Sequence, residues 1–251
     1  MLKKCIIALS AVLMFGLAQA SADNIKAEIQ YSPMNVNYAC PCNSGTLSIP
    51  TFKLGLEGNV YRGLKLGLSY QGNLGEGNGN FHTGPLEMYN NTSVTDVSYS
   101  NFELNLKFPL DGKKWASNYT SSGARENNFY FNLGYKNNSL TTTFHPRGYA
   151  SETRDMEKGN GIGFGLGYDG YFAGKWGFNA AVNYYPSMNS SAIYPFDTSY
   201  NSWVYRLGVS YDLNETFGVK VGYEGENHSY KDVDNTYVNY NGIVFGVNAR
   251  W

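Results

Sequence analysis

Hydrophobic and polar residues alternate with a period of two along most of the chain from residue 25 onward. A weak example runs from Ile25 to Tyr31, and nine stronger ones follow: Phe52–Leu56, Leu64–Tyr70, Phe102–Phe108, Phe129–Tyr135, Ile162–Tyr168, Trp176–Tyr184, Trp203–Tyr211, Phe217–Tyr223 and Ile243–Trp251. A period of two places the apolar side chains on one face of a β-strand. No stretch of comparable length has the spacing of an amphipathic helix. We therefore predict an all-β fold of about ten antiparallel strands, or eight if the weak first strand and one neighbour do not form.

The connections between these segments alternate between short and long. Short ones lie at Tyr61–Gly63, Gly170–Lys175 and Asp212–Thr216. Long polar ones cover Ser32–Ser48, Gly72–Asp96, Lys136–Asn160, Pro186–Ser199 and Glu226–Thr236. This alternation is typical of the two ends of an up-and-down β-barrel. One connection, Pro109 to Asn128, is long where a short turn is expected, so either the chain makes an excursion there or the strand boundaries are wrong.

The first 22 residues have the features of a secretory signal peptide. Lys3 and Lys4 precede an apolar run from Cys5 to Ala18, and small residues suited to cleavage follow. We therefore expect two parts, a signal peptide at 1–22 and a single barrel domain at 23–251. Without the signal, 17 Lys or Arg face 20 Asp or Glu, so the net charge of −3 argues against a nucleic-acid partner.

Alternation alone does not say whether the apolar face points into the barrel, as in a soluble protein, or out toward lipid. Charged residues make up only 16% of the chain, against about 25% in soluble proteins. Aromatic residues also mark both ends of the strands, as in the interfacial girdles of membrane barrels. One predicted girdle holds Tyr70, Tyr135, Tyr184 and Tyr223, and the opposite one holds Phe108, Tyr168, Tyr211 and Trp251. These features favour a transmembrane barrel.

The last predicted strand, with Ile243, Phe245, Val247, Ala249 and a terminal Trp251, alternates strictly and ends on an aromatic residue. It resembles the C-terminal strand of bacterial outer-membrane β-barrel proteins, in the size range of the OmpA transmembrane domain and the omptins. The resemblance implies secretion with a cleaved signal and insertion into the bacterial outer membrane. It also implies contact with outer-membrane lipid and recognition of the strand ending in Trp251 by the barrel-assembly machinery.

If the apolar face meets lipid, its polar neighbours point into the lumen. The predicted lumen charges are six bases and four acids: Lys53, Lys65, Lys107, Arg206, Lys220, Arg250, Glu57, Glu103, Asp212 and Glu224. Charges inside a narrow barrel need partners or water, so a salt-bridged plug is favoured over a polar conduit that repels cations. Four inward glycines, Gly161, Gly163, Gly165 and Gly167, either make room for large neighbours or line a narrow water path.

Small outer-membrane barrels resembling this one in size include omptin proteases and lipid A-modifying enzymes, so a catalytic site has to be considered. All three histidines, His82, His145 and His228, fall in predicted outer loops, and His228 has Asp232 and Asp234 nearby as possible partners for a hydrolase. Omptins need an acidic pair as well, which has no counterpart here, and the sequence has no serine nucleophile motif. We therefore expect a barrel without catalysis, and keep the loop-sited hydrolase as the alternative.

The predicted outer loops are rich in Tyr, Asn, Ser and Thr, as at Tyr194–Asp197, a composition that suits recognition of an extracellular ligand as well as simple solubility. Cys40 and Cys42 could form a local disulfide, remain thiols or bridge to another chain, and no further ligands stand near them for a metal. No cofactor is expected. The sequence thus favours a narrow channel, or a barrel for surface recognition or envelope stability.

Overall fold

The computed structural model describes residues 25–40, 43–61, 64–74, 78–83, 92–110, 128–144, 152–190, 199–231 and 236–250. These ranges form eleven β-strands: β1 (Ile25–Cys40), β2 (Asn43–Tyr61), β3 (Leu64–Asn73), β4 (Asn78–Thr83), β5 (Thr92–Pro109), β6 (Asn128–Phe144), β7 (Glu152–Ala173), β8 (Trp176–Ser190), β9 (Tyr200–Asp212), β10 (Phe217–Tyr230) and β11 (Tyr237–Arg250). No helix among the described residues is long and apolar enough to cross a membrane.

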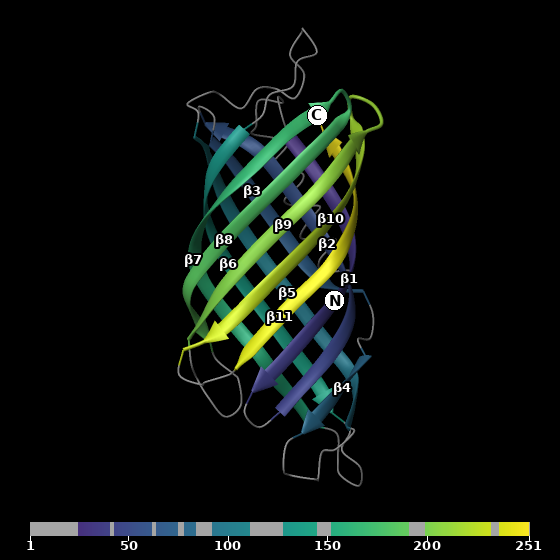
Figure 1. Cartoon of the computed structure of the whole chain (residues 1–251), viewed down its shortest axis with the longest axis vertical. Helices are drawn as coiled ribbons and strands as arrows, with labels where there is room; N and C mark the ends of the chain where they lie inside the picture. Colours follow the sequence, from purple (N-terminus) through teal and green to yellow (C-terminus); the bar gives the residue numbers. More distant parts are fainter. Residues whose placement is uncertain are drawn as a thin grey trace.

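The strands form one closed antiparallel barrel (Figure 1). Closure comes from β1, which pairs with β2 on one side and with the last strand, β11, on the other. Strands β3 and β4 share one position in the wall, because both pair with β2 and with β5. The wall therefore has ten positions, which confirms the predicted all-β architecture and strand count, including the weak first strand.

Several predicted outer loops are wrong, because strands occupy much of them. Strand β1 continues to Cys40 and β2 begins at Asn43, so only two residues separate the strands where a connection over Ser32–Ser48 is predicted. The connections predicted at Lys136–Asn160 and Glu226–Thr236 are shortened in the same way by longer strands. The polar residues there alternate with buried ones, and a polar outward face is easily mistaken for a loop.

The connection between Pro109 and Asn128 keeps its predicted length. Pro109, at the end of β5, is the register partner of Tyr130, the third residue of β6. The predicted strand boundaries on either side of this connection are therefore right to within one residue. The residues between 110 and 128 lie outside the described part of the chain.

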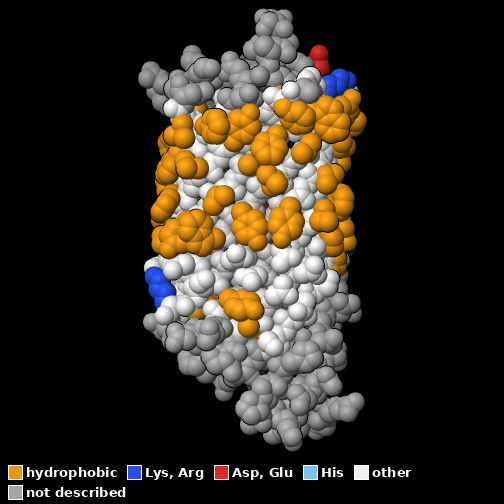
Figure 2. All heavy atoms as spheres, in the orientation of Figure 1, with side chains coloured by type: hydrophobic (Ala, Val, Ile, Leu, Met, Phe, Trp, Pro, Cys, Tyr) orange, Lys and Arg blue, Asp and Glu red, His pale blue; other side chains and the backbone are white. Residues whose placement is uncertain are grey.

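A band of exposed apolar side chains surrounds the end of the barrel that carries the short turns; we call it the lipid belt (Figure 2). One of these turns is only two residues long and has Gly174 at φ 54°, a conformation that glycine adopts without strain. On β8 the belt runs from Trp176 to Tyr184, nine residues, which at a strand tilt near 40° cover about 23 Å. A soluble barrel does not expose such a band to water, so the belt identifies a membrane-spanning barrel.

Aromatic pairs lie at both borders of the lipid belt. Near the short turns the rings of Trp176 and Tyr211 are 4.8 Å apart, and at the opposite border those of Tyr184 and Trp203 are 4.5 Å apart. Rings with an apolar body and a polar tip suit the boundary between lipid and water. Of the predicted girdle residues, Trp251 lies outside the described part of the chain.

Beyond the belt, the strands continue as what we call the outer segment, where the hydrophobic pattern changes face. On β1, Ile29 points outward and is 62% exposed, whereas Val36 points into the barrel and is 0% exposed. The apolar core of the described chain lies inside this segment: Met34, Val36, Tyr38, Leu47, Ile49, Val97, Tyr99, Leu140, Tyr185, Met188, Tyr200, Val204, Tyr230, Val238 and Tyr240. Water surrounds the outer segment, so its apolar residues are buried inside, as in a soluble protein.

Candidate functional site in the lumen

Charged side chains occupy the lumen in three successive layers. Within the belt they point inward because each inward position alternates with a lipid-facing one. The structure places the ten predicted lumen charges in this network. It adds seven residues that the sequence analysis did not assign to the lumen: Lys26, Glu28, Lys136, Glu157, Asp169, Glu226 and His228.

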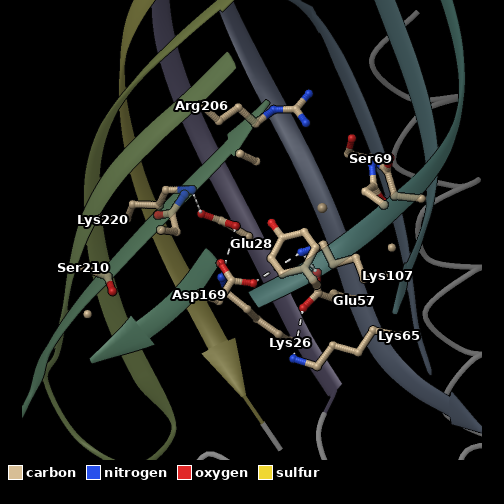
Figure 3. A pocket seen from close by; sticks show the side chains of 18 of the residues that line it. Lys26, Glu28, Glu57, Lys65, Ser69, Lys107, Asp169, Arg206, Ser210 and Lys220 are labelled. Carbon is tan, nitrogen blue, oxygen red and sulfur yellow. Dashed lines mark hydrogen bonds and ion pairs between the residues drawn. The ribbon is translucent and has the colours of Figure 1, made fainter. Parts of the chain in front are cut away.

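The first layer surrounds a cavity of about 230 Å³ in the half of the barrel that carries the short turns; we call this cavity the inner cup (Figure 3). On one side, Glu57 forms ion pairs with Lys65, at 3.4 Å, and with Lys107. On the other side, Glu28 lies 3.4 Å from Lys26 and 3.3 Å from Lys220. Two carboxylates therefore each serve two lysines. Nearer the short turns, Arg250 pairs with Asp212 at 2.9 Å.

The second layer crosses the lumen at the deep end of the inner cup. Arg206 donates from Nη2 to both carboxylate oxygens of Glu103, at 2.6 and 2.7 Å, and from Nε to Glu224 at 2.6 Å. Lys53 donates to Glu224 at 2.8 Å. Two bases thus meet two acids that come from four different strands. This balanced set links opposite walls of the barrel.

The third layer lies inside the outer segment and centres on His228. Its Nδ1 atom lies 2.6 Å from Glu157 Oε1, as an ion pair without hydrogen-bond geometry, and its Nε2 atom contacts Glu226. Glu226 also binds Lys136 and accepts a hydrogen bond from Ser202 at 2.7 Å. Two carboxylates therefore face two cations, provided that His228 is protonated.

Aromatic side chains enclose the third layer. The ring of Tyr200 stacks on His228 with centroids 4.5 Å apart, and Tyr230 donates a hydrogen bond to Glu157 at 2.9 Å. Burial lowers the pKa of His228, but the Glu157 and Glu226 carboxylates raise it by more, to about 9. His228 lies five residues beyond Tyr223 at the belt border, so the group that titrates is in the outer segment, outside the membrane-spanning part.

Exposure falls steadily along this path. Lys26 and Asp169 at the mouth of the cup are 32% and 34% exposed, Lys53 is 12% exposed, and Glu103 is 2% exposed. In the third layer, His228 is 0% exposed. The described side chains thus leave the inner cup open to solvent at the short-turn end and close it at the second layer. Within the described part of the chain, the lumen is therefore a cup that is open at one end and packed with side chains at the other.

The four inward glycines make room for neighbouring side chains. A Cβ atom on Gly163 would clash with Tyr185, one on Gly165 with Asn183 and the backbone of Val182, and one on Gly167 with Tyr130. At Gly161 the neighbour is Met188, 2.9 Å from such an atom. This geometry favours the steric interpretation of the glycines over a water path, with Tyr, Asn and Met side chains as the neighbours in place of the Arg206 that the sequence suggests.

The structure contradicts the loop position on which the hydrolase alternative depends. The prediction that His228 lies in a loop is wrong, because the residue is part of β10 and points into the barrel, with both ring nitrogens on glutamates. Its proposed partners Asp232 and Asp234 lie outside the described residues, as do His145 and the side chain of His82. The signal peptide at 1–22, Cys42 and the side chain of Cys40 also lie outside them.

Four of the seven missed residues share a sequence signal. Lys136, Glu157, Glu226 and His228 lie in stretches that the sequence predicts as polar loop. The signal that identifies these stretches as strand is the change of face, in which the apolar residues move from odd positions such as Ile29 to even positions such as Val36. Glu157 and Glu226 could have been found by continuing the inward parity past the belt.

No protein-family model matches the sequence, and no curated protein matches it either. Among solved structures, the chain is similar to Neisserial surface protein A (12% identity, 92% of this chain and 98% of the other, TM-score 0.35). It is also similar to the translocator domain of autotransporter NalP from Neisseria meningitidis (7%, 99% and 97%, 0.45). A third is the outer membrane protein OprG from Pseudomonas aeruginosa (14%, 92% and 96%, 0.38). These structures are small outer-membrane β-barrels, and likenesses this distant supply no argument about activity.

Proposed function

We propose that the protein is a closed barrel of the bacterial outer membrane that acts in surface recognition, without catalysis and without steady conduction. A single-chain antiparallel barrel with a lipid belt is the outer-membrane type of membrane protein. The short turns then face the periplasm and the outer segment projects from the cell. The signal peptide predicted at 1–22 supports the same location.

One observation carries this proposal: the outer segment has an apolar core of its own. Val36, Ile49 and Val97 are fully buried inside it, next to the His228 layer. Such a core seals the lumen and stiffens the strands beyond the lipid, so that the connections at that end are held on a rigid support. A conducting pore has no use for a core in this place, whereas a platform that presents a binding surface does.

Conductance tests the closed state. Purified barrel in a planar bilayer should show no steady current, or only rare small openings. Large, stable, porin-sized conductance would refute the proposal, because ten strands around a packed core leave no wide aqueous path.

Recognition is tested at the outer end. The segment Tyr194–Asp197 belongs to the connection between β8 and β9 and lies outside the described residues. It is replaced by Gly and Ser residues of equal number, and wild type and variant are compared for binding to a panel of glycans and surface polymers. We expect a ligand that binds wild type and is lost in the variant, while the heat-dependent gel mobility of the two barrels stays the same. Failure of wild type to bind any member of a broad panel leaves envelope stability as the better account.

The hydrolase alternative has less support, because His228 has no exposed surface and both of its ring nitrogens are engaged. A general base has to reach the proton that it removes. Replacing His228 by Ala should therefore leave any hydrolytic activity of the purified barrel unchanged, apart from losses caused by unfolding. Specific loss of such activity in a folded variant would restore the alternative.

A further inference from the structure

The side chains that line the inner cup include more bases than acids. Among the described residues that line it, seven are Lys or Arg and four are Asp or Glu: Lys26, Lys53, Lys65, Lys107, Arg206, Lys220 and Arg250 against Glu28, Glu57, Glu103 and Asp169. The lipid belt surrounds the cup, and walls of low dielectric constant strengthen the field of the charges inside. Two further acids pair with these bases, Glu224 with Lys53 and Arg206 and Asp212 with Arg250, so that seven bases face six acids. The one positive charge in excess favours an anion over a cation in the cup.

The geometry around Glu28 shows where an anion would sit. Glu28 has to serve both Lys26 at 3.4 Å and Lys220 at 3.3 Å, and neither contact is short. Close charge-assisted hydrogen bonds between lysine and carboxylate are about 2.7–2.9 Å long. Both ammonium groups thus keep donor capacity for a second acceptor. In Figure 3, Lys220 and Lys26 approach Glu28 from opposite sides.

A further donor, Ser210, lies on the strand next to Lys220. Ser210 on β9 is the register partner of Lys220 on β10, so the two side chains leave neighbouring strands on the same face. Both line the inner cup (Figure 3). The Lys220 ammonium and the Ser210 hydroxyl each supply donors for the several acceptor oxygens of an oxyanion. The volume of about 230 Å³ is ample, since a single water needs about 10–15 Å³.

We infer that the inner cup binds a small oxyanion such as inorganic phosphate, held by Lys220 and Lys26, with Ser210 of the neighbouring strand as a further donor. The anion enters through the mouth of the cup, where Lys26 is partly exposed, and goes no farther than the Arg206 layer. Glu28 is its competitor for the two lysines. The cup is thus a site for small periplasmic anions, separate from the recognition surface at the outer end.

The competition gives two variants with effects of opposite sign. Refolded full-length barrel in a nonionic detergent is titrated with phosphate at pH 7 in a zwitterionic buffer, and binding is followed by calorimetry. Wild type should show saturable binding at one site. Lys220→Gln should weaken it about tenfold or more, because a full charge near the anion is lost. Glu28→Gln should tighten it several-fold, because the competing carboxylate becomes neutral.

The controls separate a built site from general attraction. Lys158→Gln removes an exposed lysine of the outer segment and should leave phosphate binding unchanged. Chloride at equal ionic strength should not displace phosphate from wild type. Each barrel is accepted only if it keeps its heat-dependent gel mobility.

Three results would overturn the inference. They are the absence of saturable phosphate binding by wild type, equal affinity in folded Lys220→Gln, and weaker binding in Glu28→Gln. If one variant does not fold, the wild-type titration and the other variant still decide the question.

Discussion

Protonated His228 should stabilise the outer segment, and its loss of charge should be visible as a pH dependence of unfolding. The ring lies between Glu157 and Glu226, and the same layer contains Lys136. The rings of Tyr200, Tyr230 and Tyr240 pack around this layer. With His228 charged, the layer is neutral, whereas a neutral His228 leaves one carboxylate charge without compensation in a dry interior.

The sign and size of the effect follow from the pKa. The pKa of His228 is raised to about 9 in the folded barrel, and the ordinary value of 6.5 applies to the unfolded chain. The stabilisation is therefore complete below about pH 6.5 and is lost as the pH rises through about 9. A difference near 2.5 pKa units corresponds to about 3 kcal/mol of unfolding free energy.

The assay is urea unfolding of the barrel in lipid vesicles, followed by tryptophan fluorescence at pH values from 6 to 10. Wild type should lose stability over this range. His228→Gln should be less stable at pH 6 and should change little with pH, whereas His145→Gln should behave like wild type. If His228→Gln loses as much stability as wild type between pH 6.5 and 10, the reasoning about the third layer is wrong.

The same unfolding assay checks three further predictions. Glu103→Ala should cost about 3–5 kcal/mol, because it leaves buried cations unpaired, whereas Glu215→Ala in an exposed turn should change stability by less than about 0.5 kcal/mol. Gly165→Leu should lower the urea midpoint or prevent folding, since even a Cβ atom clashes there; unchanged stability would mean that the wall yields. Val36→Asp should destabilise by several kcal/mol, as a carboxylate in the outer core, while Asn35→Asp on the outward face should be nearly neutral.

The sequence predicts the membrane-spanning part of this fold well. Strict alternation over seven to nine residues, as in Trp176–Tyr184, is a local signal and needs no partner strand to be read. The number of wall positions follows from counting such segments. The closure of β1 on β11 is a long-range contact, and only the up-and-down order of the strands suggests it.

The outer segment is harder to predict because two solvents act on one strand. The register between β1 and β2 is unbroken from Ile25–Gly58 to Cys40–Asn43, so the strand itself does not change there. What changes is the parity of the apolar residues, from Ile29 outward to Val36 inward. A prediction that requires the apolar residues to stay on one face ends the strand at the belt border, and it assigns the residues beyond the border to a loop.

The third layer could not be assembled from sequence for a different reason. Glu157 on β7 and His228 on β10 are separated by 71 positions and meet only because the barrel closes around them. Proximity in sequence suggests Asp232 and Asp234 as the partners of His228. Alternation along β10 already points His228 inward, the same way as Glu226, and this parity is the better guide to its partners.

The change of parity also explains how the barrel can fix its depth in the membrane. A slip of one residue between β1 and β2 would turn Ile29 toward the charged lumen and, at the same time, turn Val36 toward water. The lipid belt and the outer core would then both lose buried apolar surface, so both stabilise the same register between β1 and β2. A shift of the whole barrel along the membrane normal is opposed as well, because it would bring the polar outward residues of the outer segment into lipid. The outer core therefore holds the strands at a fixed height above the bilayer, which the proposed role in recognition requires.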